Sequence, residues 1–494
     1  MMTRETAKSR EQVQLLSLDD LVPKDHLVRK LDATLDWNFI YDMVEEKYSD
    51  GIGRPSIDPV VLIKLPVIQY MFGLRSMRQT IRETEVNSAY RWFLGLDIQD
   101  PIPHFSTFGK NYSRRFKNTD LFERIFQHIL SECFKAGLVD AGVVFVDSTH
   151  VKARANSKKY HDEAAKEQTL WYEKELLEEI QKDREAHGKK PLKEAVSGDD
   201  DGQEPPKPSG SGKRNKNTSK KKLARGKKEK HVKVSSSDPD SGWFRKGEHK
   251  NVFAYNVQTA CDANGVILGY SVHPGNENDG RTFPAVLEKL EELPVEVVVG
   301  DTAYKTPAIA HLLKGIKLLS TYGRPKTKEG FFPKHEYVYD EYYDCYICPN
   351  NQILSYSTTN RDGYREYKSC DSICASCPFL AQCTNSKEHV KVVTRHVWAD
   401  ALEEVEENRY TYGIREYYKL RKETIERDFA LAKELHGFRY TQEYGLARME
   451  WKAALTYACM NLKKLAKMRW KEGKETLSSS RFQTLFALFL PIPE

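Results

Sequence analysis

The 494-residue sequence contains no apolar run as long as the roughly 18 residues that a membrane-spanning helix requires. Its first residues, MMTRETAKSREQVQLL, lack the apolar stretch of a secretory signal peptide. The apolar segment LFALFLPIP near the end is too short to span a bilayer, so we expect it to pack on its own domain or on a partner. These features predict a cytoplasmic protein with no membrane partner.

Apolar residues are also scarce in residues 205–233, PPKPSGSGKRNKNTSKKKLARGKKEKHVK, which hold twelve Lys and Arg and one acid. Such a composition cannot bury a core, and we expect it to be disordered without a partner. Nucleic acid is the polyanion that this segment would bind, and a solvated linker is the alternative. The preceding stretch, EAAKEQTLWYEKELLEEIQKDREAHGKK, is charged and helical in pattern.

The first 135 residues are predicted to be helical. Asp58 and Pro59 are start signals for the apolar helix DPVVLIKLPVIQYMF, and Gly73 ends it. Ser76 is placed as the N-cap of the next helix, SMRQTIRETEV, and a basic helix, STFGKNYSRRFKN, comes later. A helix, a glycine turn and two further helices are compatible with a helix-turn-helix DNA reader. A helical bundle with a cationic face is the alternative.

A β-rich region follows the helices. Residues 143–147 predict a strand that ends at Asp147, and residues 251–261 and 266–272 predict a hairpin around Asn264 and Gly265. A helix is expected at 281–292, and strands at PVEVVVGD, which ends at Asp301, and at 316–320. Two strands therefore deliver an aspartate to their C-terminal ends, where ligands gather in open α/β sheets. A strand-ending turn residue is the alternative reading of Asp147.

Paired carboxylates at strand ends suit a hard divalent cation, which requires oxygen ligands held close together. A third acid from a helix would complete a site for two ions about 4 Å apart, which stabilise both oxygens of a phosphoryl displacement. The segment YYKLRKETIERDFALAKELHGFRY, residues 417–440, can supply it from Glu426, which shares a helical face with Lys422 and Lys433. Ordinary pairing of charges on a helix surface is the alternative.

The segments VFVDST, VVVGDTAYKT and YYKLRKETIERDFALAKELHGF together resemble the DDE transposases of bacterial insertion sequences. The N-terminal segments GRPSIDPVVLIKLPVIQYMFGLRSMRQTIRE and PHFSTFGKNYSRRF are similar to the helical N-terminal domain of the same transposases. The resemblance implies an α/β RNase H-like catalytic core and an all-α N-terminal domain. With the other patterns, we expect a basic, disordered insertion and a small Cys-rich zinc-binding insertion as well.

The resemblance implies a catalytic triad of Asp147, Asp301 and Glu426, with Glu423 as an alternative acid. These residues would bind two Mg²⁺ or Mn²⁺ ions. DNA would be cut at the element's ends, and the freed 3′-hydroxyl would be joined to target DNA. Two other functions remain open: a transposase-derived DNA-binding protein without catalysis, and a metal-dependent DNA nuclease that cuts but does not join.

The helix around Glu426 departs from the family's pattern at one point. Tyr418 and Arg421 keep the family's first interval, and Glu426 and Lys433 keep its last. The interval between Arg421 and Glu426 is one residue longer than in the family, unless Lys422 takes the place of the arginine.

DNA contacts are expected from cations of the N-terminal helices, of the strand beyond Asp147 and of the late helix. These residues are Arg75, Arg78, Arg82, Arg114, Arg115, Lys152, Arg154, Arg421 and Lys433. The partners would be double-stranded DNA, both as terminal inverted repeats and as target. A homodimer on DNA and association with the nucleoid are implied by the resemblance.

Six of the nine cysteines lie between Cys345 and Cys383. In a reducing compartment this cluster indicates a metal rather than disulfides, and CxxC pairs are typical of tetrahedral zinc. The resemblance selects the four zinc ligands Cys348, Cys374, Cys377 and Cys383. Cys345 and Cys370 would be spare or would replace one of the four, and unliganded thiols are the alternative. Three others are expected to be core thiols: Cys133, Cys261 and Cys459.

The sequence patterns and the resemblance together predict five regions. They are a helical DNA-binding domain (1–135), the first part of the core (140–156 and 241–322), a charged insertion (157–240), a Cys-rich insertion (323–400) and the C-terminal part of the core with the Glu426 helix (401–494).

Overall fold

The computed structural model describes residues 15–48, 56–117, 119–164, 170–192, 231–246, 250–323, 327–411 and 413–487. These residues form two compact units: those between 1 and 161, 234 and 299, and 415 and 494 belong to the first, and those between 162 and 233 and between 300 and 414 belong to the second. The helical region expected at 1–135 falls in the first unit, and the Cys-rich region expected at 323–400 falls in the second. Most of the basic stretch expected to be disordered lies outside the described residues.

The N-terminal part of the first unit is helical, as the sequence predicts. Its helices are α1 (Leu18–Leu21), α2 (Leu27–Thr34), α3 (Phe39–Val44), α4 (Pro59–Met71), α5 (Met77–Val86), α6 (Ser88–Leu94), α7 (Phe105–Asn111) and α8 (Leu121–Lys135), with a π-helical turn at Tyr112–Phe116. Both predicted start signals are confirmed, because Asp58 and Ser76 cap α4 and α5. Ten of the thirteen residues of α4 are buried, which makes it the central helix of this part.

Burial of a charged residue in α4 is compensated by polar partners. Lys64 is 8% exposed, and its ammonium donates to a carboxylate oxygen of Asp32 at 2.8 Å and to the carbonyl of Phe93 at 2.9 Å. A buried charge is tolerated only when it is paired and hydrogen-bonded in this way. The contact therefore ties α4 to α2 and α6.

A mixed sheet forms the centre of the first unit. Strand β1 (Val143–Lys152) pairs antiparallel with β5 (Lys250–Cys261) and parallel with β7 (Val297–Gly300). Strand β5 also pairs antiparallel with β6 (Ile267–Pro274) and with β4 (Gly242–Lys246). The predicted hairpin of β5 and β6 is confirmed, with Gly265 at a φ of +72° in its turn. Strand β4 was not predicted.

The prediction that β1 ends at Asp147 is wrong. The parallel pairing of β1 with β7 stops at Phe145, opposite Val299. The antiparallel pairing with β5 continues as far as Lys152, opposite Ala254. The long partner β5 thus keeps β1 extended beyond the aspartate, and Asp147 lies just past the point where β1 loses its parallel neighbour.

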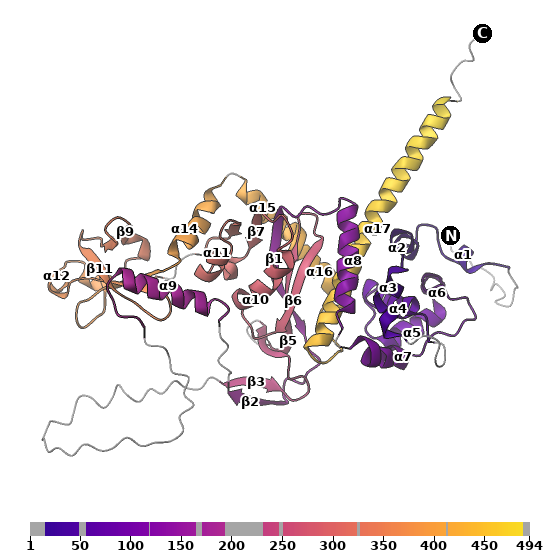
Figure 1. Cartoon of the computed structure of the whole chain (residues 1–494), viewed down its shortest axis with the longest axis horizontal. Helices are drawn as coiled ribbons and strands as arrows, with labels where there is room; N and C mark the ends of the chain where they lie inside the picture. The colour runs from indigo at the N-terminus through magenta and orange to yellow at the C-terminus, as the bar shows by residue number, and fades with distance from the viewer. Residues whose placement is uncertain are drawn as a thin grey trace, which may run out of the picture. The chain divides into compact units, whose positions relative to one another are not determined.

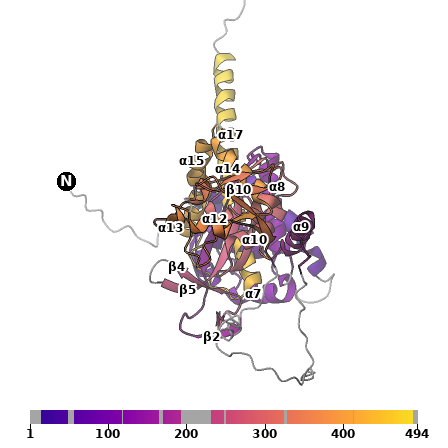
Figure 2. The same ribbon diagram turned by 90° about the vertical axis from the view of Figure 1, so that its left-hand side faces the viewer.

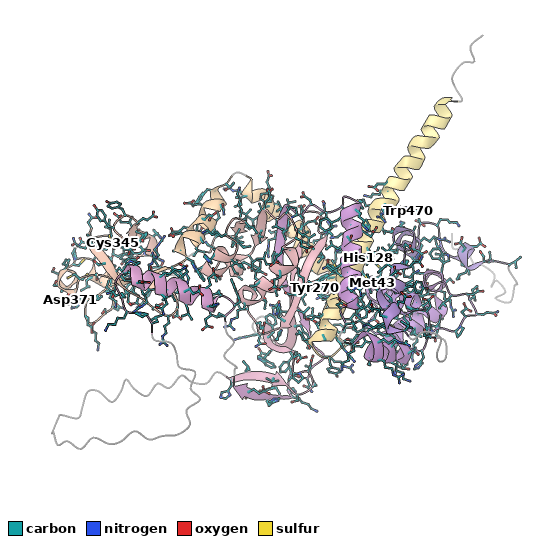
Figure 3. All side chains as sticks on the ribbon, in the orientation of Figure 1. Met43, His128, Tyr270, Cys345, Asp371 and Trp470 are labelled. Carbon is teal, nitrogen blue, oxygen red and sulfur yellow. The ribbon has the colours of Figure 1, made fainter. Side chains whose placement is uncertain are left out.

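Helices cover the sheet of the first unit. The long helix α17 (Leu446–Ala487) packs beside α8 and strand β6 (Figure 1), and both views show it continuing beyond α8 (Figure 2). Tyr270 of β6, labelled in Figure 3, meets the ring of Phe126 of α8 edge-on at 5.2 Å. Helix α10 (Asp279–Leu287) packs on β5 and β6, and it was predicted at 281–292. A 3₁₀ turn at Glu288–Leu290 replaces its predicted last turn.

The remaining helices of the first unit follow one another along the chain. They are α15 (Ile414–Arg421), a π-helical turn at Lys422–Glu426 and α16 (Arg427–Leu435). The turn packs against β1 and β5, so the sheet and this helical segment are in direct contact.

The second unit is built around a five-stranded antiparallel sheet in the order β13-β12-β11-β10-β9. The strands are β9 (Val338–Asp340), β10 (Cys345–Ile347), β11 (Ile353–Thr359), β12 (Tyr364–Lys368) and β13 (Val392–His396). Its other elements are β2 (Tyr160–Ala164), α9 (Glu173–Ala186), β3 (His231–Ser235), α11 (Pro307–Leu312), β8 (Lys317–Ser320), α12 (Asp371–Ala375), α13 (Leu380–Cys383) and α14 (Ala399–Glu407).

Two predicted elements are confirmed in the second unit: the charged helix before the basic stretch is α9, and the strand expected at 316–320 is β8. Helix α9 is held to the five-stranded sheet by Asp183, which accepts from Arg365 at 2.7 Å, and by Arg184, which donates to the carbonyl of Thr359 at 2.7 Å. Within the described ranges, no helix combines the length and apolar character that crossing a bilayer demands.

Candidate active site

Two of the three predicted catalytic carboxylates share one arginine. The guanidinium of Arg421 donates to Asp147 at 2.6 Å and to Glu426 at 2.7 Å. The side chains of Asp147 and Arg421 are 19% and 14% exposed, whereas that of Glu426 is 45% exposed. The backbone N–H of Ser148 donates to the other oxygen of Asp147 at 2.8 Å. The sheet therefore fixes Asp147, and Arg421 links it to Glu426.

A π-helical turn explains how Arg421 reaches Glu426 across an interval that is one residue too long for the family's pattern. The turn spans Lys422–Glu426. A π-helix closes its hydrogen bonds over five residues instead of four, so residues five apart lie above one another. The hydroxyl of Thr424, within the turn, donates to the carbonyl of Leu420 at 2.7 Å. The insertion is thereby absorbed within a continuous helical segment.

The same turn distinguishes Glu426 from the other acids around it. Lys422 is exposed and Arg421 makes the contact, so the arginine keeps its predicted place beside the glutamate. Glu423, the alternative acid, lines a separate cavity with Arg427. Asp428 is buried and forms an ion pair with Lys464 at 2.9 Å.

Asp301, the third predicted acid, belongs to the second unit and follows β7 directly. Its side chain caps a 3₁₀ turn by accepting from the N–H of Ala303 at 2.7 Å. Its carbonyl accepts from the hydroxyl of Ser320 at 2.9 Å, and the residue is half-buried. In the part of the chain that the structure describes, no three His, Cys, Asp or Glu side chains are already arranged around a common metal position.

A cavity of about 320 Å³ lies between the α4–α5 turn and the end of α16. It brings together Arg75 and Lys433, which the sequence predicts as DNA contacts, with Arg439 and Lys452. Sequence analysis did not identify Lys452. Burial lowers its pKa to about 8, and its ammonium donates to the carbonyls of Gly437 and Tyr440 at 2.9 and 2.8 Å. Only the tertiary structure shows this role, because both carbonyls belong to the connection after α16.

The α4–α5 turn touches the end of α16 through main-chain atoms. Gly73 has a φ of +66°, and a Cβ there would lie 2.6 Å from the carbonyl oxygen of Leu435. The ring of His436 donates through Nδ1 to the carbonyl of Tyr70 at 2.8 Å, and burial lowers the pKa of His436 to about 4. His436 is the C-cap of α16, and it also joins that helix to the N-terminal helices.

The other predicted DNA contacts differ in how far the protein already uses them. Arg78 lies over the ring of Phe105 at 4.3 Å, and Arg115 lies over the ring of Tyr48 at the same distance. Arg154 donates to the carbonyl of Gln442 at 3.1 Å. Three further cations are exposed: Arg82, Arg114 and Lys152.

Four cysteines line one small cavity in the second unit. The cavity has a volume of about 20 Å³, and the four are Cys348, Cys374, Cys377 and Cys383. Cys345 is buried in β10, and the exposed thiol of Cys370 lies 3.1 Å from the hydroxyl of Ser372. The three cysteines predicted as core thiols are buried, which confirms that prediction: Cys133, Cys261 and Cys459.

Two family models match the chain. A transposase domain (DUF772) matches residues 16–114, and a transposase DDE domain matches residues 347–466. The chain belongs to the DDE transposases of insertion sequences. In this transposase, the first family model covers α1 to α7. The second covers Glu426 but neither Asp147 nor Asp301. Comparisons with curated proteins and with solved structures gave no match.

Membership of this family makes DNA the partner of the transposase. The N-terminal match includes the exposed arginines of the α4–α5 region, and the C-terminal match includes the whole π-helical turn, Arg421 and Lys433.

Proposed function

We propose that the transposase cuts DNA at the ends of its element and joins the freed 3′ end to target DNA, at a metal centre made by Asp147, Asp301 and Glu426. The observation that carries the proposal is the convergence of Asp147 and Glu426 on the single cation Arg421. A strand and a helix far apart in the sequence hold carboxylates around one positive charge. Oxygen ligands in such an arrangement suit Mg²⁺ or Mn²⁺.

The register of the parallel strands supports Asp301 as the third ligand. Phe145 of β1 lies opposite Val299 of β7. Asp147 is two residues beyond Phe145, and Asp301 is two residues beyond Val299. Because the two strands are parallel, both acids follow at the same end of the sheet. An RNase H-like core is part of the same proposal. Its support is a run of antiparallel strands, β1, β5 and β6, followed by β7 parallel to β1.

The chain's own residues would act in the following way. The three carboxylates would hold two divalent ions, which would stabilise the attacking and leaving oxygens of a phosphodiester. Asp147 sits on the rigid sheet, which fixes its oxygens. With the carboxylates holding metal ions, the guanidinium of Arg421 would be available to a phosphate of the DNA backbone, which its planar group suits. Lys433, seven residues beyond Glu426, adds a second positive charge on α16.

The two chemical steps use the same residues. In the first, water attacks the phosphorus atom at the element's end and displaces a 3′-hydroxyl. In the second, that hydroxyl attacks a phosphorus atom of target DNA and displaces a 3′ oxygen there. We assign no serine or tyrosine nucleophile, because neither step needs a covalent link to the protein. Two ends must be cut together, so we propose a homodimer on the DNA.

We also propose that Cys348, Cys374, Cys377 and Cys383 hold a structural zinc ion. Their support is that these four thiols line one cavity while Cys345 and Cys370 do not. Four protein ligands leave no open position, so the ion would stabilise the second unit rather than take part in catalysis.

The test is cleavage and strand transfer of DNA that carries the element's own ends, with Mg²⁺ or Mn²⁺. Wild type is compared with Asp147→Asn, Asp301→Asn and Glu426→Gln, and DNA binding is measured in parallel. We expect all three variants to bind and none to cut. Binding without cutting by the wild type would favour a DNA-binding protein, and cutting without joining would favour a nuclease.

A further inference from the structure

A second, larger cavity of the first unit lies between α2, α16 and α17. Its volume is about 670 Å³. Six cations from these helices line it, against two carboxylates, Glu423 and Asp428. The cations are Lys30, Arg427, Lys463, Lys464, Lys467 and Lys471. None of the four lysines of α17 was singled out from the sequence, because they lie within a long helix whose environment depends on the tertiary fold.

Among the residues that the structure describes, one of these six cations, Lys464, forms an ion pair with a carboxylate. Lys464 binds the carboxylate of Asp428 at 2.9 Å and also donates to the carbonyl of Gly265. Within the described residues, no ion pair joins a carboxylate to Lys463, Lys467 or Lys471. Among the described residues, the cations that line the cavity therefore outnumber the carboxylates by six to two.

The three unpaired lysines of α17 form a row. Lys463, Lys467 and Lys471 are spaced four residues apart, so they share one helical face and follow each other at about 6 Å along the axis. Like charges at this spacing destabilise a helix by a few tenths of a kcal/mol for each pair. A row of charges fits an extended polyanion better than a single small anion.

Apolar side chains form the remaining wall of the cavity, and they strengthen the electrostatic attraction between the lysines and a bound anion. Trp470, on α17 (Figure 3), Met468 and Leu431 line the cavity. The ammonium of Lys30 lies 5.1 Å from the centre of the Trp470 ring. Burial, together with the charge of Lys467, lowers the pKa of Lys463. A phosphate would relieve this repulsion, and it would be held more tightly next to an apolar wall than in open water.

We propose that this cavity is a second DNA site, which binds the phosphate backbone of duplex DNA without reading its sequence. The site is distinct from the carboxylates that face Arg421, because Glu423 and Arg427 turn toward the cavity while Glu426 turns toward Arg421. The inference rests on the proposed function. A transposase must hold DNA beyond the phosphodiester that it cuts, and this row of lysines gives it a place to do so.

The test is the salt dependence of binding to a random-sequence duplex. Wild type is compared with the triple variant Lys463→Gln, Lys467→Gln, Lys471→Gln. The matched control is Lys24→Gln, Lys47→Gln, Lys135→Gln, which removes the same charge from exposed lysines of the first unit outside the cavity. Each lost phosphate contact reduces the slope of log K against log salt by about 0.9. We expect the magnitude of this slope to fall by about two to three in the triple variant and by less than about one in the control.

A second measurement locates the DNA. The tryptophan emission of the wild type should change when the random duplex binds, and most of that change should be absent in Trp470→Phe. Equal slopes in the triple variant and the control, or an unchanged emission response in Trp470→Phe, would overturn the proposal. The single variant Lys471→Gln changes one exposed residue, so it tests the proposal even if the triple variant misfolds. Its slope should fall in magnitude by about one. Cleavage of the element's ends by the same wild-type preparation tests the proposed function separately.

Discussion

Arg421 donates a hydrogen bond to Asp147 across 274 positions of the sequence, and the same guanidinium holds Glu426. Arginine is always charged, so at every physiological pH its single positive charge offsets one of the two negative charges of these carboxylates. Under the proposed function, divalent ions would compete with Arg421 for the same oxygens. The arginine would then hold the two carboxylates together without ions and lower their apparent affinity for them.

Replacing Arg421 separates its stabilisation of the metal-free site from its competition with metal ions. Arg421→Ala should lower the free energy of unfolding of the metal-free protein by about 2 kcal/mol, because two charge-assisted hydrogen bonds are lost. Added Mn²⁺ should then raise the melting temperature more in the variant than in the wild type. Adding Asp147→Asn to Arg421→Ala is the control and should remove the Mn²⁺ effect. Equal Mn²⁺ shifts in wild type and Arg421→Ala would contradict the competition.

The two glutamates of the π-helical turn should differ sharply in their effect on activity. Glu426→Gln removes a charge beside Asp147 and should reduce the rate of DNA cleavage by about 10³-fold or more, a loss of roughly 4 kcal/mol of transition-state stabilisation. Glu423→Gln is the matched control, because this side chain faces the basic cavity. We expect it to keep cleavage within about tenfold. Loss of cleavage only in Glu423→Gln would mean that the other acid binds the metal.

The sequence was sufficient to predict the capping residues of α4 and α5, because these depend on local patterns. Asp147 and Glu426 were selected by the family resemblance, and the structure brings both to Arg421. The π-helical turn could not be predicted in this way. It depends on buried Thr424 and Ile425 packing against the sheet, and a one-residue excess in spacing has several structural solutions. Strand β1 was predicted too short for a similar reason, since its continuation past Asp147 depends on a partner a hundred residues away.

Contacts between distant segments could not be predicted from the sequence. Gly73 was recognised as a helix breaker, but its approach to the carbonyl of Leu435 requires the folded chain. The basic cavity is another case. Its lysines stand out only when Lys30 and Arg427 are brought beside α17.

Gly73 gives a direct measure of how the N-terminal helices depend on α16. Gly73→Ala should destabilise the protein by about 1–2 kcal/mol for the left-handed backbone and by a further 1–3 kcal/mol for the clash with Leu435. Gly95→Ala is the matched control, because Gly95 has a φ of +71° with no heavy atom within 4 Å of the added carbon. Urea unfolding of both variants gives the difference. Equal losses would show that the main-chain contact with α16 is absent.

Zinc content tests the cysteine proposal independently of DNA. Cys374→Ser should lose bound zinc, as measured by elemental analysis of the purified protein, and should lower the melting temperature of the second unit. Cys370→Ser is the control, because this thiol does not line the cavity. A chelator should produce in the wild type the same destabilisation as Cys374→Ser. Equal zinc in the wild type and in Cys374→Ser would exclude this thiol as a ligand.

The last prediction concerns pH and the buried Asp428, two residues after Glu426. Burial raises the pKa of Asp428 to about 6, although Lys464 opposes the shift. The native state therefore binds this proton more tightly than the unfolded chain, in which the pKa of aspartate is about 3.9. The stabilising contribution is complete below about pH 4 and is lost as the pH rises through about 6. It amounts to about 3 kcal/mol, since one pKa unit corresponds to about 1.4 kcal/mol.

Asp428→Asn isolates this group from every other titrating residue. The variant lacks the carboxyl but keeps its size, and Lys464 retains the carbonyl of Gly265 as a partner. The free energy of unfolding of the variant minus that of the wild type should therefore increase between about pH 4 and pH 6.5 and stay level above. Urea unfolding of both proteins across this range gives that difference. A difference that is constant with pH would mean that the ion pair with Lys464 outweighs burial and keeps Asp428 ionised throughout.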